Sequence, residues 1–451
     1  MAIETTDQRA PRLKLLREAL ESGTLRQVQR MINSLHPAEI ADLLESLPPA
    51  ERDVVWELVD TQSDGDVLVE LNEEVRAKLL GEMDFDELVA AAGGMDLDDL
   101  ADLVPDLPEA VSRQVIQSMD QQDRERLRSV MAYGEDTAGG LMDPDIVTVR
   151  PDVTLEVVLR YLRIRSELPD GSDALFVVNR FDRYLGYLYL SSLLTADPGK
   201  TVAELMDSSV EGIPAATGAT EVANLFEIRD LVTAPVVDPD GRLVGRITID
   251  DVVDVIREEA EHSILSMAGL AEDEDMFAPV VTSSRRRAIW LGVNLATAFI
   301  AASVVGLFQA TIDQVVALAV LMPIVASMGG IAGSQTLTLI VRGLALGQVQ
   351  SSNARWLMFR ELAVGVLNGL GWALVVATAT ILWFKSWILG GIIGLALVIN
   401  LVVAAFSGVL IPLVLRRLKI DPALAGSVVL TTVTDVVGFM VFLGLGALWL
   451  T

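Results

Sequence analysis

The sequence contains no cysteine and only two histidines, His36 and His262. Without cysteine the chain has no disulfide, no thiolate metal ligand and no thiol redox chemistry. Both histidines lie outside the long apolar segments, which disfavours a zinc or copper site and favours hard cations with oxygen ligands. The sequence shows no nucleophile–base pair and no histidine suited to catalysis, so an enzyme is not expected.

Acidic residues far outnumber basic residues in the first part of the chain and are scarce in the second. Residues 285–451 hold 10 of the 34 Lys and Arg and 4 of the 62 Asp and Glu, so residues 1–284 hold 24 basic and 58 acidic residues, a net charge of −34. A part this acidic is not expected to bind nucleic acid or anionic lipid, but it attracts cations. Some of the charge also serves solubility, and a count does not separate the two uses.

Long apolar runs occur only after residue 285, in five segments that are each long enough to cross a lipid bilayer of about 30 Å. Arginine and lysine concentrate at one set of segment ends, which places these ends and the acidic part in the cytoplasm and the C-terminus outside. Five spans without a visible inverted repeat favour a pore on a twofold axis between two subunits. The expected spans of the cell (inner or plasma) membrane are residues 288–308, 315–346, 356–384, 388–415 and 423–450.

The last apolar segment carries one ionisable residue, Asp435, near its middle. A carboxylate at mid-depth costs roughly 2.5–3.5 kcal/mol on insertion scales, so it is not expected to face lipid. Thr431 and Ser427 precede it at intervals of four, and the three side chains therefore share one helix face. That face is typical of an ion path. The alternative is an aspartate that is satisfied by hydrogen bonds between packed helices.

The second apolar segment is interrupted by residues 328–336, which contain three glycines and a polar triplet. This composition predicts a helix that is either locally broken along the ion path or closely packed. Small residues for tight packing remain the plain alternative.

Residues 1–134 are expected to form an acidic helical domain, because apolar residues recur at helical spacing. Residues 36–48 and 96–108 resemble each other, which favours a small superhelix of helix pairs. The second of these fragments carries a run of aspartates that includes Asp98 and Asp102. These carboxylates are candidate cation ligands, and the alternative is a solvated helix face.

Residues 135–258 contain an internal repeat, with copies at about 139–200 and 203–258. Each copy shows a helical run followed by two strands, which predicts a small α/β unit. The pair resembles tandem CBS domains, regulatory modules that often bind adenine nucleotides. Asp251 follows the last strand of the second copy, where it is placed to hold a ribose, whereas the first copy has Ser191-Ser192. Neither copy has a phosphate-binding glycine loop, and the nucleotide-binding residues are unknown.

A connecting helix is expected from Asp250 to Met267. In the domain division its first part belongs to the CBS pair, residues 259–284 are the connecting (plug) helix and linker, and residues 285–451 are the transmembrane domain. Acidic residues recur along one side of the helix, which makes an acidic stripe. The stripe consists of Asp251, Asp254, Glu258 and Glu261.

With these features the chain resembles the MgtE family of magnesium channels over nearly its full length. The specific stretches are LMPIVASMGGIAGSQTLTLIVRGLA, DPALAGSVVLTTVTDVVG and YGEDTAGGLM. The resemblance implies a homodimer with a central pore, in which Asp435 of each subunit holds a hydrated Mg²⁺. It also implies that Mg²⁺ closes the pore by binding to acidic cytoplasmic residues. The sensor positions that it implies are Asp98, Asp102, Asp230, Asp251, Asp254 and Glu259.

The sequence departs from the family pattern at a few positions. Ile331 stands where the family often has asparagine, and Ser427-Val428 where some members have Asn-Pro. His262 and Ser263 occupy two sensor positions that are acidic in some members. These differences leave the fold unchanged and bear on ion preference and on the number of sensor ions.

The sequence therefore predicts a multidomain protein with a superhelical α-helical domain, an α/β CBS pair, a connecting helix and a five-helix transmembrane domain. Its expected function is a dimeric magnesium channel or transporter that Mg²⁺ closes; an adenine nucleotide is a further candidate ligand of the CBS pair. One alternative is a proton- or Na⁺-coupled carrier, which the lack of an internal repeat in the membrane part disfavours. Another is a membrane-tethered nucleotide sensor that transports nothing.

Overall fold

The computed structural model describes residues 25–93, 95–165, 168–169, 171–270, 275–350 and 352–450. The chain divides into two compact units. The first unit comprises Met1–Ala260 and Asp273–Ala278, and the second comprises Glu261–Glu272 and Pro279–Thr451. Each unit has its own hydrophobic core. The first 24 residues of the predicted helical domain lie outside the described residues.

The amino-terminal part of the first unit is built from short helices, as the sequence predicted. Several begin at a side chain that accepts hydrogen bonds from the first turn: Asn72 accepts from the N–H of Val75, and Asp84 from those of Asp86 and Glu87. The helices are α2 (Leu25–Ile32), α3 (Pro37–Glu45), α4 (Pro49–Trp56), α5 (Asp64–Val69), α6 (Glu73–Glu82), α7 (Phe85–Ala92), α8 (Leu97–Leu103), η2 (Val104–Asp106), α9 (Glu109–Ser118) and α10 (Gln121–Val130).

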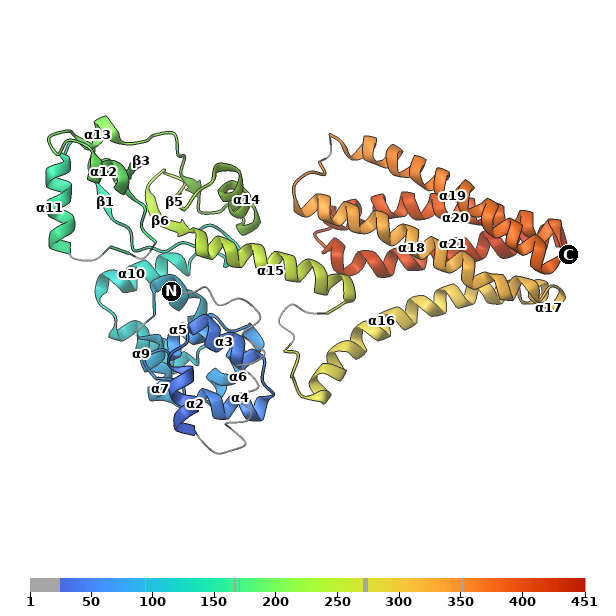
Figure 1. The fold of residues 1–451 in the computed structure, drawn as a ribbon, viewed down its shortest axis with the longest axis horizontal. Coiled ribbons are helices and arrows are strands. Elements are labelled where there is room, and N and C mark those ends of the chain that lie inside the picture. The colour runs from blue at the N-terminus through green and yellow to red at the C-terminus, as the bar shows by residue number, and fades with distance from the viewer. Residues whose placement is uncertain are drawn as a thin grey trace. The chain divides into compact units, whose positions relative to one another are not determined.

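The internal repeat is visible as two sheets of the same topology (Figure 1). In each sheet a short first strand pairs in parallel with the second, which pairs antiparallel with the third. The first copy contains β1 (Thr148–Val149), α11 (Leu155–Arg165), β2 (Ala174–Val178), β3 (Tyr184–Tyr189) and α12 (Leu190–Thr195). The second follows α13 (Val202–Leu205) and contains β4 (Ile213–Pro214), α14 (Ala219–Arg229), β5 (Thr233–Val237) and β6 (Leu243–Thr248).

The predicted connecting helix is α15 (Ile249–Ala268), which continues directly from β6 (Figure 1). Its first twelve residues belong to the first unit, and its remaining residues, from Glu261 on, belong to the second. The helix therefore links the two units covalently without a loop at the point where one ends and the other begins.

The second unit contains five helices that are long and apolar enough to cross a membrane. Helix α20 is the most buried of them and contacts α18, α19 and α21, so it forms the centre of this unit. The helices are α16 (Val280–Leu307), the short α17 (Gln309–Gln314), α18 (Ala317–Ala345), α19 (Ala354–Phe384), α20 (Trp387–Arg417) and α21 (Pro422–Leu450).

Of the two structures predicted for residues 328–336, the locally broken helix is wrong and the closely packed helix is confirmed. Helix α18 is continuous through these residues. A side chain at Gly329 would overlap the amide of Asn400, and a Cβ at Gly333 would lie 3.0 Å from Leu430. The glycines therefore serve the close approach of α20 and α21 to a continuous helix.

Candidate functional site

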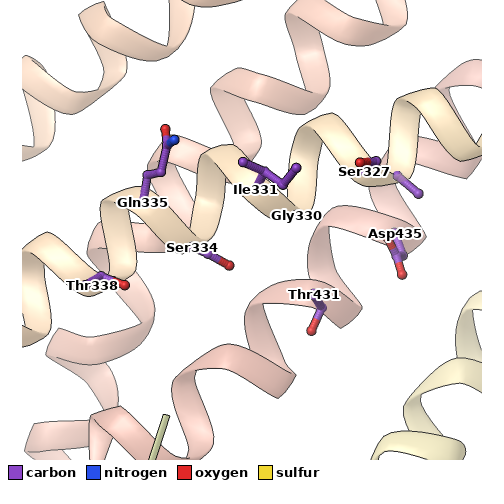
Figure 2. A pocket seen from close by; sticks show the side chains of 9 residues that line it. Ser327, Gly330, Ile331, Ser334, Gln335, Thr338, Thr431 and Asp435 are labelled. Atoms are coloured by element: carbon purple, nitrogen blue, oxygen red, sulfur yellow. The ribbon is translucent and has the colours of Figure 1, made fainter. Parts of the chain in front are cut away.

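A groove of about 820 Å³ runs along α18 and α21. Helix α21 contributes Thr431 and Asp435, and Figure 2 shows both side chains beside the polar residues of α18. The α18 residues fall into two rows at a spacing of four, so they lie on one helix face. They are Ala326, Ser327, Gly330, Ile331, Ser334, Gln335 and Thr338.

The groove holds a single ionisable side chain among the described residues that line it, Asp435. It is open on one side, because Ile331 is 58% exposed and Thr431 is also exposed. An isolated carboxylate thus lines an open groove that also carries the side chains of Ser327, Ser334, Gln335, Thr338 and Thr431. Such a group is expected to meet a cation or a second protein surface rather than lipid.

The hydroxyl of Thr431 is held by the backbone of its own helix. Its Oγ1 donates to the carbonyl of Ser427 at 2.6 Å, so the lone pairs of the oxygen remain available to the groove. Ser427 itself is not among the described lining residues. The structure therefore places Thr431 and Asp435 in the same groove. Ser427 contributes only the carbonyl that accepts the hydrogen bond from Thr431.

The first unit contains an acidic cluster, which consists of Asp98, Asp99 and Asp102 on α8 and Asp251 on α15. Burial raises the pKa of Asp98 to about 7, and the charges of Asp143 and Asp251 add to the rise. Burial and neighbouring aspartates raise the pKa of Asp99 to about 8. Burial is also the main cause that raises the pKa values of Asp102 and Asp251 to about 6. These carboxyl groups exchange protons near neutral pH, where a cation competes with the protons.

One oxygen of the acidic cluster has no hydrogen-bond partner. Within the described residues, Oδ1 of Asp98 is buried and accepts no hydrogen bond. A buried polar atom in this state is unfavourable unless a proton, water or cation satisfies it. In the same described ranges no three acidic or histidine side chains converge on one point as metal ligands. The carboxylates approach one another without forming a preassembled cage.

Three family models match successive parts of the chain. The model described as MgtE intracellular N domain matches residues 35–136, the CBS domain model matches residues 138–199 and 202–258, and the model described as divalent cation transporter matches residues 322–445. The magnesium transporter MgtE of Thermus thermophilus is 32% identical over 440 residues, which cover 96% of this chain and 98% of that protein. The chain belongs to the MgtE family.

Other MgtE proteins give the same result. The magnesium transporter MgtE of Bacillus subtilis is 28% identical over 94% of both chains. The crystal structure of the cytosolic domain of the Mg²⁺ channel MgtE in complex with ATP is 35% identical, with 53% of this chain and 98% of that chain covered and a TM-score of 0.48. The recognition of an MgtE protein from its sequence motifs is thus confirmed.

The other candidate sensor residues, Asp254 and Glu259 from the MgtE resemblance and Glu258 from the acidic stripe, are dispersed along α15. Glu258 is close enough to Asp102 to contribute to the rise of its pKa. Asp254 is exposed. The pKa of Glu70 in the helical domain is raised mainly by burial, and the charge of Asp254 adds to this rise. Glu259 lies half-buried one position beyond Glu258. The acidic stripe therefore faces the helical domain at more than one level.

Asp230 lies in a different place from the other acidic positions. It ends α14 in the left-handed conformation, with φ of +51°, and lines a cavity of about 400 Å³ between the two CBS copies. The same cavity is lined by Asp173, Tyr187, Asp207 and Arg229. The structure thus separates Asp230 from the acidic cluster on α8 and α15.

Asp251, which the sequence placed to hold a ribose, is bonded through one carboxylate oxygen to Thr248 at the start of α15. Its Oδ2 accepts from both the N–H and the hydroxyl of Thr248, at 3.1 and 2.9 Å. These bonds cap the start of α15 and direct the carboxylate toward the acidic cluster.

Sequence reasoning missed two polar residues that line the groove, Ser327 and Thr338. They lie just outside residues 328–336, which had been singled out for their glycines. Ser327 lies four positions before Ile331, and Thr338 lies four positions after Ser334. This spacing places both on the same helix face and would have identified them.

Proposed function

We propose that this protein transports Mg²⁺ across the cell membrane through a pore that two copies of the chain form at the groove between α18 and α21. The observation that carries the proposal is Asp435, the lone ionisable group among the described residues of an open groove in a membrane-spanning helix. Membership of the MgtE family supports the choice of ion, since the relatives are magnesium transporters.

The open side of the groove supports a homodimer. In a single subunit Asp435 would face lipid, at a cost of roughly 2.5–3.5 kcal/mol. A second copy about a twofold axis covers both grooves and brings the two carboxylates face to face. Their mutual repulsion is relieved when a divalent cation lies between them.

The chemistry of the groove suits a hydrated ion. Mg²⁺ keeps its waters tightly, in an octahedral shell. Six waters of about 30 Å³ each occupy about 180 Å³, which a groove of about 820 Å³ accommodates. The outward lone pairs of Thr431 and the carboxylate of Asp435 accept hydrogen bonds from these waters, so the ion passes without losing its shell.

The orientation and the domain division belong to the same proposal. The basic run at residues 285–287 lies at the cytoplasmic end of α16, with the helical and CBS domains in the cytoplasm and the C-terminus outside. The domains are residues 1–134, 135–258, 259–284 and 285–451.

The acidic cluster supports gating by Mg²⁺. A cation that replaces the protons of Asp98, Asp102 and Asp251 joins α8 to the start of α15. Because α15 continues into the second unit, its position then depends on the cytoplasmic Mg²⁺ concentration. The proposed sensor ligands are Asp98, Asp102, Asp230, Asp251, Asp254, Glu258 and Glu259.

Nucleotide binding at the CBS pair rests on the cavity near Asp230. Tyr187 and Tyr189 offer aromatic surface, and Asp173 and Asp207 offer acceptors for ribose hydroxyls. With Arg229 as the one basic lining residue in the described chain, the cavity suits an adenine nucleoside moiety better than a free triphosphate.

Flux through purified protein in liposomes, followed with an internal Mg²⁺ indicator, tests the pore. Wild type is expected to load the vesicles, and Asp435→Ala is expected to lose the flux while it remains folded. The matched control is Asp313→Ala, which removes the same charge from α17. Flux that requires a proton or Na⁺ gradient would favour a coupled carrier instead, and undiminished flux through Asp435→Ala would overturn the pore assignment.

A further inference from the structure

Asn400 is a fully buried amide in the middle of α20, the most buried membrane helix. Its Nδ2 donates to the carbonyl of Val325 on α18 at 2.9 Å. Its Oδ1 is also buried, and among the described residues it has no hydrogen-bond partner. Asn400 does not line the groove. An apolar residue of similar size would avoid the unpaired oxygen, so the amide is retained for the bond and the contacts that it makes.

Two glycines leave room for this amide, one on each helix of the groove. A side chain at Gly329 of α18 would overlap the Asn400 amide, and a Cβ at Gly438 of α21 would lie 2.8 Å from Nδ2. The amide is therefore enclosed between α18 and α21. Gly329 directly precedes the lining residue Gly330, and Gly438 follows Asp435 by three positions, about one helical turn.

We propose that Asn400 is a positioning residue for ion transport, because it sets the separation and register of α18 and α21 and thereby the width of the groove at Asp435. In a bilayer no hydrophobic force drives helices together, so close packing at small residues and hydrogen bonds between helices fix their spacing. The Val325 bond holds α18 on α20, and contact with Gly438 holds α21 at the same depth. A change at Asn400 is transmitted to Asp435 through one rigid turn of α21. The inference rests on the proposed pore at Asp435.

The first test separates positioning from folding. Asn400→Leu keeps the branched shape and the number of side-chain heavy atoms, and it removes the bond to Val325. It is expected to yield folded protein whose half-saturating Mg²⁺ concentration for liposome flux is shifted about tenfold or more, since small misplacements of a site have effects of this size. A purely structural role would lower the amount of folded protein and leave that concentration unchanged, and this result would overturn the proposal.

A rescue experiment covers the case in which Asn400→Leu fails to fold. Gly438→Ala places a methyl group against the amide and is expected to impair flux. Asn400→Ala removes the amide, so the double variant Asn400→Ala/Gly438→Ala is expected to regain flux relative to Gly438→Ala alone. The matched control is Gly446→Ala, on the same helix as Gly438. A Cβ at Gly446 would lie 2.9 Å from Leu318 of α18 and not near Asn400. Asn400→Ala is therefore not expected to restore the flux of Gly446→Ala. Rescue of both glycine variants, or of neither, contradicts the proposal.

Cross-linking gives a readout that does not depend on transport. The chain has no cysteine, so a pair introduced by Gly330→Cys and Thr431→Cys is unique. A Cβ at position 330 lies 3.9 Å from Cγ2 of Thr431, which is within reach of a disulfide. Oxidation is expected to be fast with Asn400 and several-fold slower with Asn400→Leu. If Asp435→Ala left flux intact, the pore assignment would fail, but the oxidation rate could still depend on Asn400. Equal oxidation rates with Asn400 and with Asn400→Leu would refute the positioning role itself.

Discussion

Arg52 donates from Nη1 to Oδ2 of Asp275 at 2.9 Å, although the two residues lie at opposite ends of the first unit's sequence. Arg52 is fully buried, and its Nε and Nη2 donate to the carbonyls of Leu44, in α3, and Leu47, just after it. Asp275 belongs to the linker between α15 and α16, and its N–H donates to Glu74. A buried charge in the helical domain thus holds the segment that leads into the first membrane helix.

Asp275→Asn is expected to destabilise α3 and α4 by about 3–5 kcal/mol, because it leaves the buried Arg52 charge without its counter-ion. Hydrogen exchange of α3 and α4 in the full-length protein measures the loss. The control is Asp53→Asn at the pair of Lys78 and Asp53, whose side chains are 35% and 41% exposed; it is expected to cost less than about 1 kcal/mol. Similar protection in both variants would mean that the buried pair has no special role.

Thr431 and Ser427 are expected to differ, although both lie on the predicted polar face of α21. Thr431→Val keeps the shape and removes the lone pairs that face the groove, so Mg²⁺ flux into liposomes is expected to fall several-fold. Ser427→Ala keeps the carbonyl that binds Thr431, so its flux should stay near that of wild type. A larger loss in Ser427→Ala than in Thr431→Val would show that the pore extends along α21 beyond the groove.

Removing carboxylates from the acidic cluster is expected to shift Mg²⁺-dependent closure to higher Mg²⁺. The variant is Asp98→Asn with Asp102→Asn, and the measurement is protection of α15 against a protease as Mg²⁺ is titrated. The control, Asp66→Asn with Asp86→Asn, removes the same charge from two exposed positions of the helical domain. Equal protection of both variants at every Mg²⁺ concentration would mean that the cluster is not a sensor.

The same titration should depend on pH. The pKa values of Asp98 and Asp99 are raised to about 7 and about 8, so without Mg²⁺ the cluster is stable while protonated and weakens as the pH rises through this range. Mg²⁺ must displace these protons, and the Mg²⁺ required for protection is therefore expected to fall between about pH 6 and about pH 8. A midpoint that does not move with pH would exclude proton competition.

Asp64 provides a pH dependence that is independent of Mg²⁺. Burial, together with Glu87 and Asp60, raises its pKa from 3.8 to about 6. Since the folded state binds the proton more tightly, the stabilisation is complete below pH 3.8 and is lost as the pH rises through about 6. Asp64→Asn is therefore expected to gain up to about 3 kcal/mol over wild type at about pH 8 and about half as much near pH 5. Urea unfolding measures the difference, and Asp66→Asn on the same helix should show no such trend.

The sequence predicted those elements whose pattern is local. Helix α15 was expected from Asp250 to Met267 and extends from Ile249 to Ala268, because its apolar and acidic residues repeat at helical spacing. Two strands were expected in each CBS copy; the structure adds a short first strand to each, β1 and β4, which the sequence did not predict. Residues 328–336 were different, since glycines permit a break as well as close packing. The residue that decides between them, Asn400, lies on another helix.

The site was predicted in part, for a related reason. Spacing by four located Thr431 and Asp435, but it extended the face to Ser427, because periodicity does not show where a groove ends. The aspartates of α8 were visible as a run of charge. Their proximity to Asp251 depends on the tertiary packing of α8 and α15. A local sequence pattern does not predict which residues of distant segments lie close together.

The two CBS sheets share an irregularity as well as a topology. The antiparallel register shifts between Val177 and Val178 in one copy and between Val236 and Val237 in the other, at the same point of the ladder. A bulge is an inserted residue, so its presence in both copies indicates that it preceded their duplication. At the positions equivalent to Ser191-Ser192 of the first copy, the second copy has Asp250-Asp251, so only the second copy supplies carboxylates to the start of α15.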